Sequence, residues 1–240
     1  MPLSPTFCDC AESAMLIDFG PGYSKQLGLA ILQLSELLEA SALPGLKESI
    51  SALSSLTVFY DPLVLPREQL VLAIERLCVG FGSPSDRGRV WEIPVSYGGE
   101  RGPDLASAAV HAGLTEDEVI ALHTGQDYFV YMLGFLPGFA YLGDLPEKLH
   151  LPRLATPRAR VPAGSVAIAA AMTAIYPLES PGGWHLIGYT PVNPWDLTRQ
   201  KEPLFRPGDR VRFEQVDPEE ARELRRLAGD GWLPNCTEAG

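Results

Sequence analysis

With 240 residues and a net charge of −11, the chain is long enough to bury a sizeable core, and we expect it to form two domains. Its hydrophobic fraction of 46% and charged fraction of 20% are typical of a soluble globular protein, and no apolar run approaches the roughly 18 residues of a membrane-spanning helix. The acidic balance argues against a nucleic-acid partner, because binding to a phosphate backbone needs a broad basic face.

The beginning of the chain and its cysteines bear on location and metal binding. Residues 1–10 lack the basic start and apolar block of a secretory signal peptide, so we expect a cytoplasmic protein without a membrane partner. Four cysteines in a chain of this length do not make a disulfide framework. Cys8 and Cys10 would need a second pair of Cys or His ligands to hold a metal ion. The sequence offers none, so we expect no metal in this chain.

The first third of the chain predicts a compact unit of strands and helices. Apolar residues at helical spacing follow Ser24, which suits the N-cap position, and Pro66 suits the start of a second helix. The order of elements implies a small antiparallel sheet with two helices on one side. We expect strands at residues 6–10, 14–19, 46–53 and 56–60, and helices at residues 24–40 and from Pro66 onward.

Residues 81–88, rich in glycine, serine and proline, form the clearest predicted linker. Beyond it we expect a strand at residues 89–97 and two short helices, at residues 103–111 and 115–123. The second of these helices begins with a capping box of Thr115 and Glu118.

From Tyr128 onward, short strands and turn signals predict a β-barrel. Residues 218–227 predict a short charged helix, and we expect the tail beyond Gly229 to be loosely held. The expected fold is therefore an α+β N-terminal domain followed by a mainly-β barrel. Its boundaries are residues 1–87 for the small α/β domain, 88–218 for the barrel, and 219–240 for a C-terminal helix and tail.

The charge pattern of residues 148–178 sets this segment apart, because it contains no acidic residue. A basic segment inside an acidic chain suggests a site for a small anion such as a carboxylate or a phosphate. Arginine can grip such a group with two parallel hydrogen bonds, and nearby prolines would hold the backbone stiff. The alternative is that Arg153 and Arg158 are solvated or paired with structural carboxylates such as Asp144 or Glu179. The basic side chains are Lys148, Arg153, Arg158 and Arg160.

Other candidate groups each have two interpretations. Residues 162–165 could turn backbone N–H groups toward an anion, or simply form a tight turn into a strand. His123 could move a proton or only end a helix favourably, and Asp104 could be a base or begin a helix. Trp184 could stack on a ligand or pack in the barrel. No phosphate-binding loop, dinucleotide fingerprint, nucleophile elbow or metalloprotease motif is present.

Several segments, in order, resemble the family of 5-oxoprolinase B subunits, which also includes allophanate hydrolase subunit 1 and sporulation-kinase inhibitor proteins. The segments are YGGERGPDL (97–105), LGFLPGFAYLGDLP (133–146), PRLATPRARVPAGSVAIA (152–169), IYPLESPGGWHLIG (175–188) and PLFRPGDRVRF (203–213). The resemblance implies a cyclophilin-like barrel.

The resemblance also implies that the chain is one component of a hydrolase that opens the cyclic amide 5-oxo-L-proline to L-glutamate at the expense of ATP, and that it is inactive alone. The implied partners are a larger C subunit with a second cyclophilin-like barrel and an A subunit. ATP would be shared with, or held by, a partner. Two alternatives within the family remain open: an allophanate hydrolase component related to urea amidolyase, and an inhibitor of a histidine kinase.

The positions that match the family's motifs give the expected site. The resemblance does not assign a role to each of these residues; in the mechanism that we expect, Arg153 and Arg158 hold the carboxylate or a developing phosphate, and backbone N–H groups near Gly164 and Ser165 stabilise an oxyanion. His123 or Asp104 would move a proton. The expected catalytic residues are His123, Asp104 and Ser165, and the expected substrate-binding residues are Arg153, Arg158, Tyr97, Gly99, Tyr176 and Trp184.

The sequence departs from the family pattern at two positions. Met172 stands where the family usually has Gln and cannot form the hydrogen bonds of an amide. Tyr189 stands where Arg or His is common. If the missing Gln contacts the substrate amide, the chain acts on a different lactam or amide.

Overall fold

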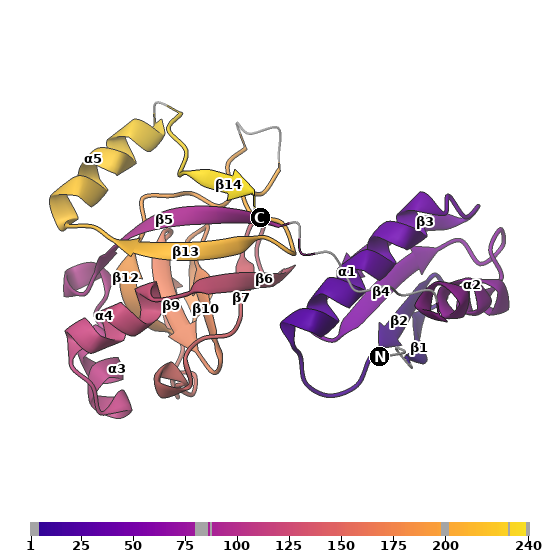
Figure 1. The fold of residues 1–240 in the computed structure, drawn as a ribbon, viewed down its shortest axis with the longest axis horizontal. Helices are drawn as coiled ribbons and strands as arrows, with labels where there is room; N and C mark the ends of the chain where they lie inside the picture. The colour runs from indigo at the N-terminus through magenta and orange to yellow at the C-terminus, as the bar shows by residue number, and fades with distance from the viewer. Residues whose placement is uncertain (1–4, 80–85, 87, 198–201, 230, 239–240) are drawn as a thin grey trace. The chain divides into compact units, whose positions relative to one another are not determined.

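Figure 1 shows the computed structural model, which describes residues 5–79, 86, 88–197, 202–229 and 231–238. By its internal contacts the chain divides into two compact units, Met1–Asp86 and Arg87–Gly240. Most of the predicted linker at residues 81–88 lies outside the described residues. None of the described helices combines the length and the apolar character needed to cross a membrane.

The first unit is a four-stranded antiparallel sheet with two helices, as the sequence predicts (Figure 1). The sheet has the order β1–β2–β4–β3. Helix α1 begins after Ser24, whose hydroxyl accepts a hydrogen bond from the N–H of Leu27. Both helices pack on the same face of the sheet, because their buried side chains join those of β2 and β4 in one apolar cluster. The elements are β1 (Thr6–Ala11), β2 (Ala14–Asp18), α1 (Lys25–Ala40), β3 (Leu46–Ser51), β4 (Ser55–Tyr60) and α2 (Arg67–Val79).

The second unit is a barrel. Its strands follow the order β12–β9–β10–β7–β6–β13–β5, and β12 pairs with β5 to close the ring. All pairings in the ring are antiparallel except that of β13 with β5. The strands are β5 (Arg89–Tyr97), β6 (Asp127–Leu133), β7 (Ala140–Leu142), β9 (Ser165–Ala169), β10 (Met172–Ile175), β12 (His185–Tyr189) and β13 (Arg210–Gln215).

Shorter elements surround the ring. Strands β8 (Arg158–Val161) and β11 (Ser180–Gly182) form a two-stranded sheet of their own. The predicted capping box of Thr115 and Glu118 is present at the start of α4. The helices are η1 (Gly99–Arg101), α3 (Leu105–Ala112), α4 (Glu116–Thr124), η2 (Glu147–Leu149) and α5 (Pro218–Gly229).

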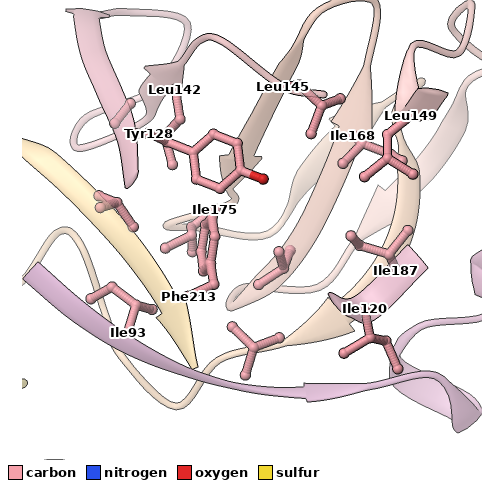
Figure 2. Packing of buried hydrophobic residues seen from close by; sticks show 14 of the residues in the cluster. Ile93, Ile120, Tyr128, Leu142, Leu145, Leu149, Ile168, Ile175, Ile187 and Phe213 are labelled. Carbon is pink, nitrogen blue, oxygen red and sulfur yellow. The ribbon is translucent and has the colours of Figure 1, made fainter. Parts of the chain in front are cut away.

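The interior of the barrel is packed with apolar side chains rather than open. Figure 2 shows side chains from several strands and from α4 meeting in this interior, among them Ile93, Ile120, Ile168 and Phe213. These four are each at most 8% exposed. Because the interior is filled, a ligand site must lie at the ends or on the outer face of the barrel.

The expectation of a loosely held tail beyond Gly229 is wrong. Strand β14 (Cys236–Glu238) pairs antiparallel with the first residues of β5. Trp232 packs against the barrel core, and the N–H of Glu92 donates to the carbonyl of Asn235 at 3.0 Å. The tail is held because β5 is longer than its partner β12 and leaves backbone groups at one edge that need hydrogen bonds.

Candidate functional site

Arg158 and Asp104 form the central ion pair of the predicted site. The Nη2 atom of Arg158, at the start of β8, lies 2.6 Å from Oδ1 of Asp104. The other carboxylate oxygen accepts the N–H of Leu186 at 2.7 Å, and the N–H of Asp104 donates to the carbonyl of Leu186 at 2.9 Å. Asp104 precedes α3, but its side chain does not cap that helix. Both carboxylate oxygens are therefore occupied, and Asp104 joins β8 to β12.

Arg153 has a different environment. It is exposed, and within the part of the chain that the structure describes it makes no hydrogen bond or ion pair. Arg160, the next basic side chain after Arg158, is instead paired with Glu179 at 2.8 Å on the exposed surface. Of the two arginines for which the sequence left this alternative open, Arg158 is paired with a structural carboxylate, that of Asp104 rather than Asp144 or Glu179, and Arg153 is exposed to solvent. Arg153 remains available to an anion.

Tyr176 lies within electrostatic range of both Arg153 and Arg158. It is 2% exposed, and burial raises the pKa of its hydroxyl. The N–H of Trp184 donates to this hydroxyl and, with the positive charges of Arg153 and Arg158, opposes that rise in pKa. Both arginines are therefore close enough to Tyr176 to act on it, so the structure brings four of the predicted substrate-binding residues together.

An aromatic group supports this region. The buried ring of Phe139 makes edge-to-face contacts with Tyr176 at 5.3 Å and with Trp184 at 5.9 Å between ring centroids. Phe135 adds its ring at 5.4 Å from Phe139, yet it is 60% exposed and has a φ of 69°. A bulky residue rarely adopts this backbone conformation, which costs roughly 1–3 kcal/mol where it occurs. The fold therefore holds an apolar ring in solvent at the edge of the site.

Buried polar atoms without partners lie on the same elements. Among the described residues, they include Nη1 of Arg158, Oγ of Ser180 and Nδ1 of His185. Strand β11 carries Ser180 and pairs with β8, while the Nε2 atom of His185 lies 2.8 Å from the carbonyl of Pro152. Because buried polar groups are normally hydrogen-bonded, three such atoms on adjacent elements suggest that a ligand or solvent completes this region.

His123 lies away from this cluster, inside the barrel. It is 0% exposed, and its ring stacks on Phe213 with centroids 4.5 Å apart. Its Nε2 atom lies 2.9 Å from Oγ1 of Thr173, and its Nδ1 atom lies 2.7 Å from the hydroxyl of Tyr97. Burial lowers the pKa of His123 to about 3. The ring is neutral near pH 7 and has no contact with solvent.

The hydrogen-bond pattern fixes the direction of each proton. The hydroxyl of Thr173 donates to the carbonyl of Ala167 at 3.1 Å, so its oxygen accepts the Nε2–H of His123. The Nδ1 atom then carries a lone pair and accepts the hydroxyl proton of Tyr97. Burial raises the pKa of Tyr97 well above its usual value, so this hydroxyl stays protonated. The chain of bonds links β5, α4, β10 and β9.

The predicted oxyanion site at residues 162–165 is wrong. The N–H of Gly164 donates to the carbonyl of Tyr176 at 2.7 Å, and the N–H of Ser165 donates to the carbonyl of Pro162 at 3.2 Å. Both groups are used in a tight turn that leads into β9, which was the alternative interpretation. Gly164 has a φ of +82° and lies against the Tyr189 ring, so a side chain would not fit there. Ser165 is buried, at 3% exposure.

Tyr97 and Gly99 line a different place, a cavity of about 440 Å³ that we call the α5 cavity. It lies between the ends of β5 and β12, helix η1 and one face of α5. Neither Arg153 nor Arg158 lines it. The predicted substrate-binding residues therefore divide into two groups, and Arg101, Arg222 and Arg225 of the cavity were not foreseen. The sequence signal for Arg222 and Arg225 was their spacing of three residues in the predicted C-terminal helix, which places them on one face.

The residues that departed from the family pattern are both at most 8% exposed. Met172 begins β10, and Tyr189 ends β12, where its ring lies beneath the guanidinium of Arg101. No set of three or more His, Cys, Asp or Glu side chains that could hold a metal ion occurs among the described residues.

Comparison with known proteins defines the class. Residues 5–205 match the family "Carboxyltransferase domain, subdomain C and D". The chain is 43% identical to the 5-oxoprolinase B subunit of Escherichia coli O157:H7, and the match covers 84% of this chain and 92% of that protein. It is 39% identical to the 5-oxoprolinase B subunit of Bacillus subtilis, with coverages of 85% and 90%. The chain therefore belongs to the family of 5-oxoprolinase B subunits, which are carboxyltransferase-like domains.

Solved structures share this fold. The crystal structure of TTHA0988 superposes with a TM-score of 0.74 at 43% identity, over 85% of this chain but 40% of that one. The Kluyveromyces lactis urea amidolyase superposes with a TM-score of 0.82 at 17% identity, over 98% of this chain and 16% of that one. At that identity the second likeness supports the expected fold class and nothing further.

Proposed function

We propose that this chain is the B subunit of an ATP-dependent 5-oxoprolinase, which opens 5-oxo-L-proline to L-glutamate together with a larger C subunit and an A subunit in the cytoplasm. The observation that carries this proposal is the 43% identity to a 5-oxoprolinase B subunit across 92% of its length. The reaction consumes two waters, one as the lactam C–N bond breaks and one as ATP is converted to ADP and phosphate.

The substrate of this reaction has a carboxylate and a small ring. Arg153, Arg158, Tyr176 and Trp184, with Phe135 at their edge, form what we call the cluster at β8, and this cluster offers a group for each part of the substrate. Arg153 is exposed and unpaired among the described residues, so its guanidinium can hold the carboxylate through two parallel N–H···O bonds. Arg158 adds positive charge from a fixed position, because Asp104 holds it at 2.6 Å. Phe135 offers an apolar surface to the ring, since it is the aromatic side chain of this region that is mostly exposed.

Other predicted residues support this cluster from beneath. Tyr176 and Trp184 are 2% and 6% exposed and pack against Phe139, which in turn contacts Phe135, so they form the buried support of that ring. Asp104 has both oxygens occupied, and His123 is enclosed in the barrel. We therefore assign a positioning role to Asp104, through Arg158, and a structural role in the barrel to His123. The proton transfers of the reaction would use groups from the partner proteins or water.

The proposal is tested with the reconstituted complex. The chain is mixed with its partners, assembly is confirmed by size-exclusion chromatography, and 5-oxoproline and ATP are added. Glutamate should form with the full complex and not with this chain alone. An assembled complex that forms no glutamate would contradict the proposal. Ammonia release from allophanate, assayed in parallel, would instead support the allophanate hydrolase alternative, and recovery of a histidine kinase from extract would support the inhibitor alternative.

A further inference from the structure

The α5 cavity is a second place where positive charge gathers, apart from the cluster at β8. Three arginines line it, Arg101, Arg222 and Arg225, and Glu100 is the acidic residue among its lining residues. The whole chain carries a net charge of −11, so a cavity lined by more basic than acidic residues differs from the rest of the chain in the sign of its charge. A concave wall of one sign of charge raises the local concentration of ligands of the opposite sign.

Arg101 is held in a fixed position in this cavity. Its Cζ atom lies 3.9 Å from the centroid of the Tyr189 ring, which is 8% exposed. This cation–π contact favours that position of the guanidinium and is not a hydrogen bond to any of its five N–H donors. Arg101 makes no hydrogen bond or ion pair with any residue that the structure describes. Its N–H groups are therefore available to a ligand.

The two arginines of α5 face the cavity from the other side. Arg222 and Arg225 are three residues apart, which places them on one face of the helix. Nη1 of Arg225 donates to the carbonyl of Pro191 at 3.3 Å, a long bond, and its other donors have no partner among the residues that the structure describes. Arg222 lies 3.6 Å from Glu219, and both side chains are more than 70% exposed, so this pair is weak. Within the described part of the chain, neither arginine is neutralised by a close, buried carboxylate.

We propose that the α5 cavity binds the polyphosphate group of a nucleoside triphosphate, with Arg101, Arg222 and Arg225 as its ligands. The inference rests on the proposed function in so far as that reaction consumes ATP. A volume of about 440 Å³ lies within the usual range for small-molecule sites and exceeds what the single ring and carboxylate of 5-oxoproline would fill. Three separated guanidinium groups match a chain of phosphates better than one carboxylate.

The test measures binding directly, without turnover. Isothermal titration of the full chain is carried out with ATP, tripolyphosphate and 5-oxoproline in turn. ATP and tripolyphosphate should bind saturably, and the affinity should fall about tenfold or more in Arg222→Ala and in Arg225→Ala, as expected for loss of a charged hydrogen bond. Arg101→Ala should have a similar effect. All three side chains are exposed, and thermal melting would confirm that the variants fold.

Arg226→Ala is the matched control, because Arg226 is the neighbour of Arg225 on the same helix but does not line the cavity. It pairs with Glu223 at 2.6 Å on the exposed surface, and its removal should change the affinity by about twofold at most. Absence of saturable ATP and tripolyphosphate binding would overturn the inference. So would equal weakening in Arg226→Ala, or loss of 5-oxoproline binding alone in the three cavity variants.

Failure of this inference is distinguishable from failure of the proposed function. If ATP binds as described and the assembled complex forms no glutamate from 5-oxoproline, the proposed function fails and the nucleotide site stands. If the complex forms glutamate and the isolated chain binds neither ATP nor tripolyphosphate, the nucleotide is held by a partner protein and this inference is wrong.

Discussion

His123 accepts the hydroxyl proton of Tyr97 at a distance of 2.7 Å, while its own Nε2–H is donated to Thr173. Both ring nitrogens of this buried imidazole are therefore occupied, and the ring contributes to the stability of the barrel through four elements of the fold. A histidine that carries protons to a substrate would instead need one nitrogen exposed to a ligand. The arrangement predicts a stability effect with a definite pH dependence.

Stability should fall in acid because of His123. Its pKa is lowered by burial to about 3 in the folded chain, against about 6.5 when unfolded, so between these values the unfolded state binds the extra proton. The contribution of His123 to the free energy of unfolding is present in full above pH 6.5 and is lost as the pH falls toward 3. The free energy of unfolding then changes by at most about 1.4 kcal/mol per pH unit because of this group. Urea melts at several pH values measure it.

The His123→Gln variant removes the titrating group and should flatten this part of the pH profile. His111→Gln is the control, since His111 is exposed on α3 and its removal should leave the slope in place. A profile for His123→Gln that keeps the full slope would show that other groups cause the acid sensitivity. The comparison depends on the slope and not on the absolute stability, which His123→Gln should also lower.

The ion pair of Asp104 and Arg158 should be coupled in stability. Replacing Asp104 by Asn leaves a partly buried guanidinium without its charge partner, and Arg158→Met leaves a nearly buried carboxylate. Because the Arg158 side chain is 30% exposed, we expect a coupling energy of about 1–2 kcal/mol, below that of a fully buried pair. A double-mutant cycle from denaturant unfolding measures it. Additive effects of the two substitutions would mean that the pair contributes nothing to folding.

Replacing Ala170 by glycine should increase the stability of the fold. It is exposed in the turn between β9 and β10 and has a φ of 50°, in the left-handed region that costs an L-residue about 1 kcal/mol. Ala170→Gly should therefore raise the free energy of unfolding by up to about 1 kcal/mol. Ala171→Gly, at the next position and without positive φ, should be neutral or slightly destabilising. Equal effects at both positions would contradict this explanation.

Local patterns predicted most elements of the fold. Ser24 caps α1, Thr115 and Glu118 form the capping box of α4, and the strands of the first unit fall where alternating and apolar runs placed them. Such features depend on residues within a few positions of one another. Strand β14 was missed because three residues carry no periodic signal, and their pairing depends on the free edge of β5 far away in the sequence.

The site was predicted in part for the same reason. The basic composition of residues 148–178 predicted a site with several positive charges, and in the structure Arg153 and Arg158 both lie close enough to Tyr176 to act on its hydroxyl. Composition cannot show that Asp104, 54 residues away, occupies one of these arginines. It also cannot show that the N–H groups of Gly164 and Ser165 are used within a turn. Charge partners and backbone bonds between distant segments are set by tertiary packing, which a single sequence does not record.

Arg153 gives the most direct test of the cluster at β8. It is exposed and unpaired among the described residues, so Arg153→Ala should change the free energy of unfolding by no more than about 0.5 kcal/mol. In the assembled complex, loss of a bidentate carboxylate contact should lower kcat/KM for 5-oxoproline about 10- to 100-fold, and Arg153→Lys should recover part of it. Arg160→Ala is the control, because Arg160 is 78% exposed and paired with Glu179. Equal losses in both variants would point to general electrostatic attraction, and unchanged kinetics in Arg153→Ala would remove this residue from the site.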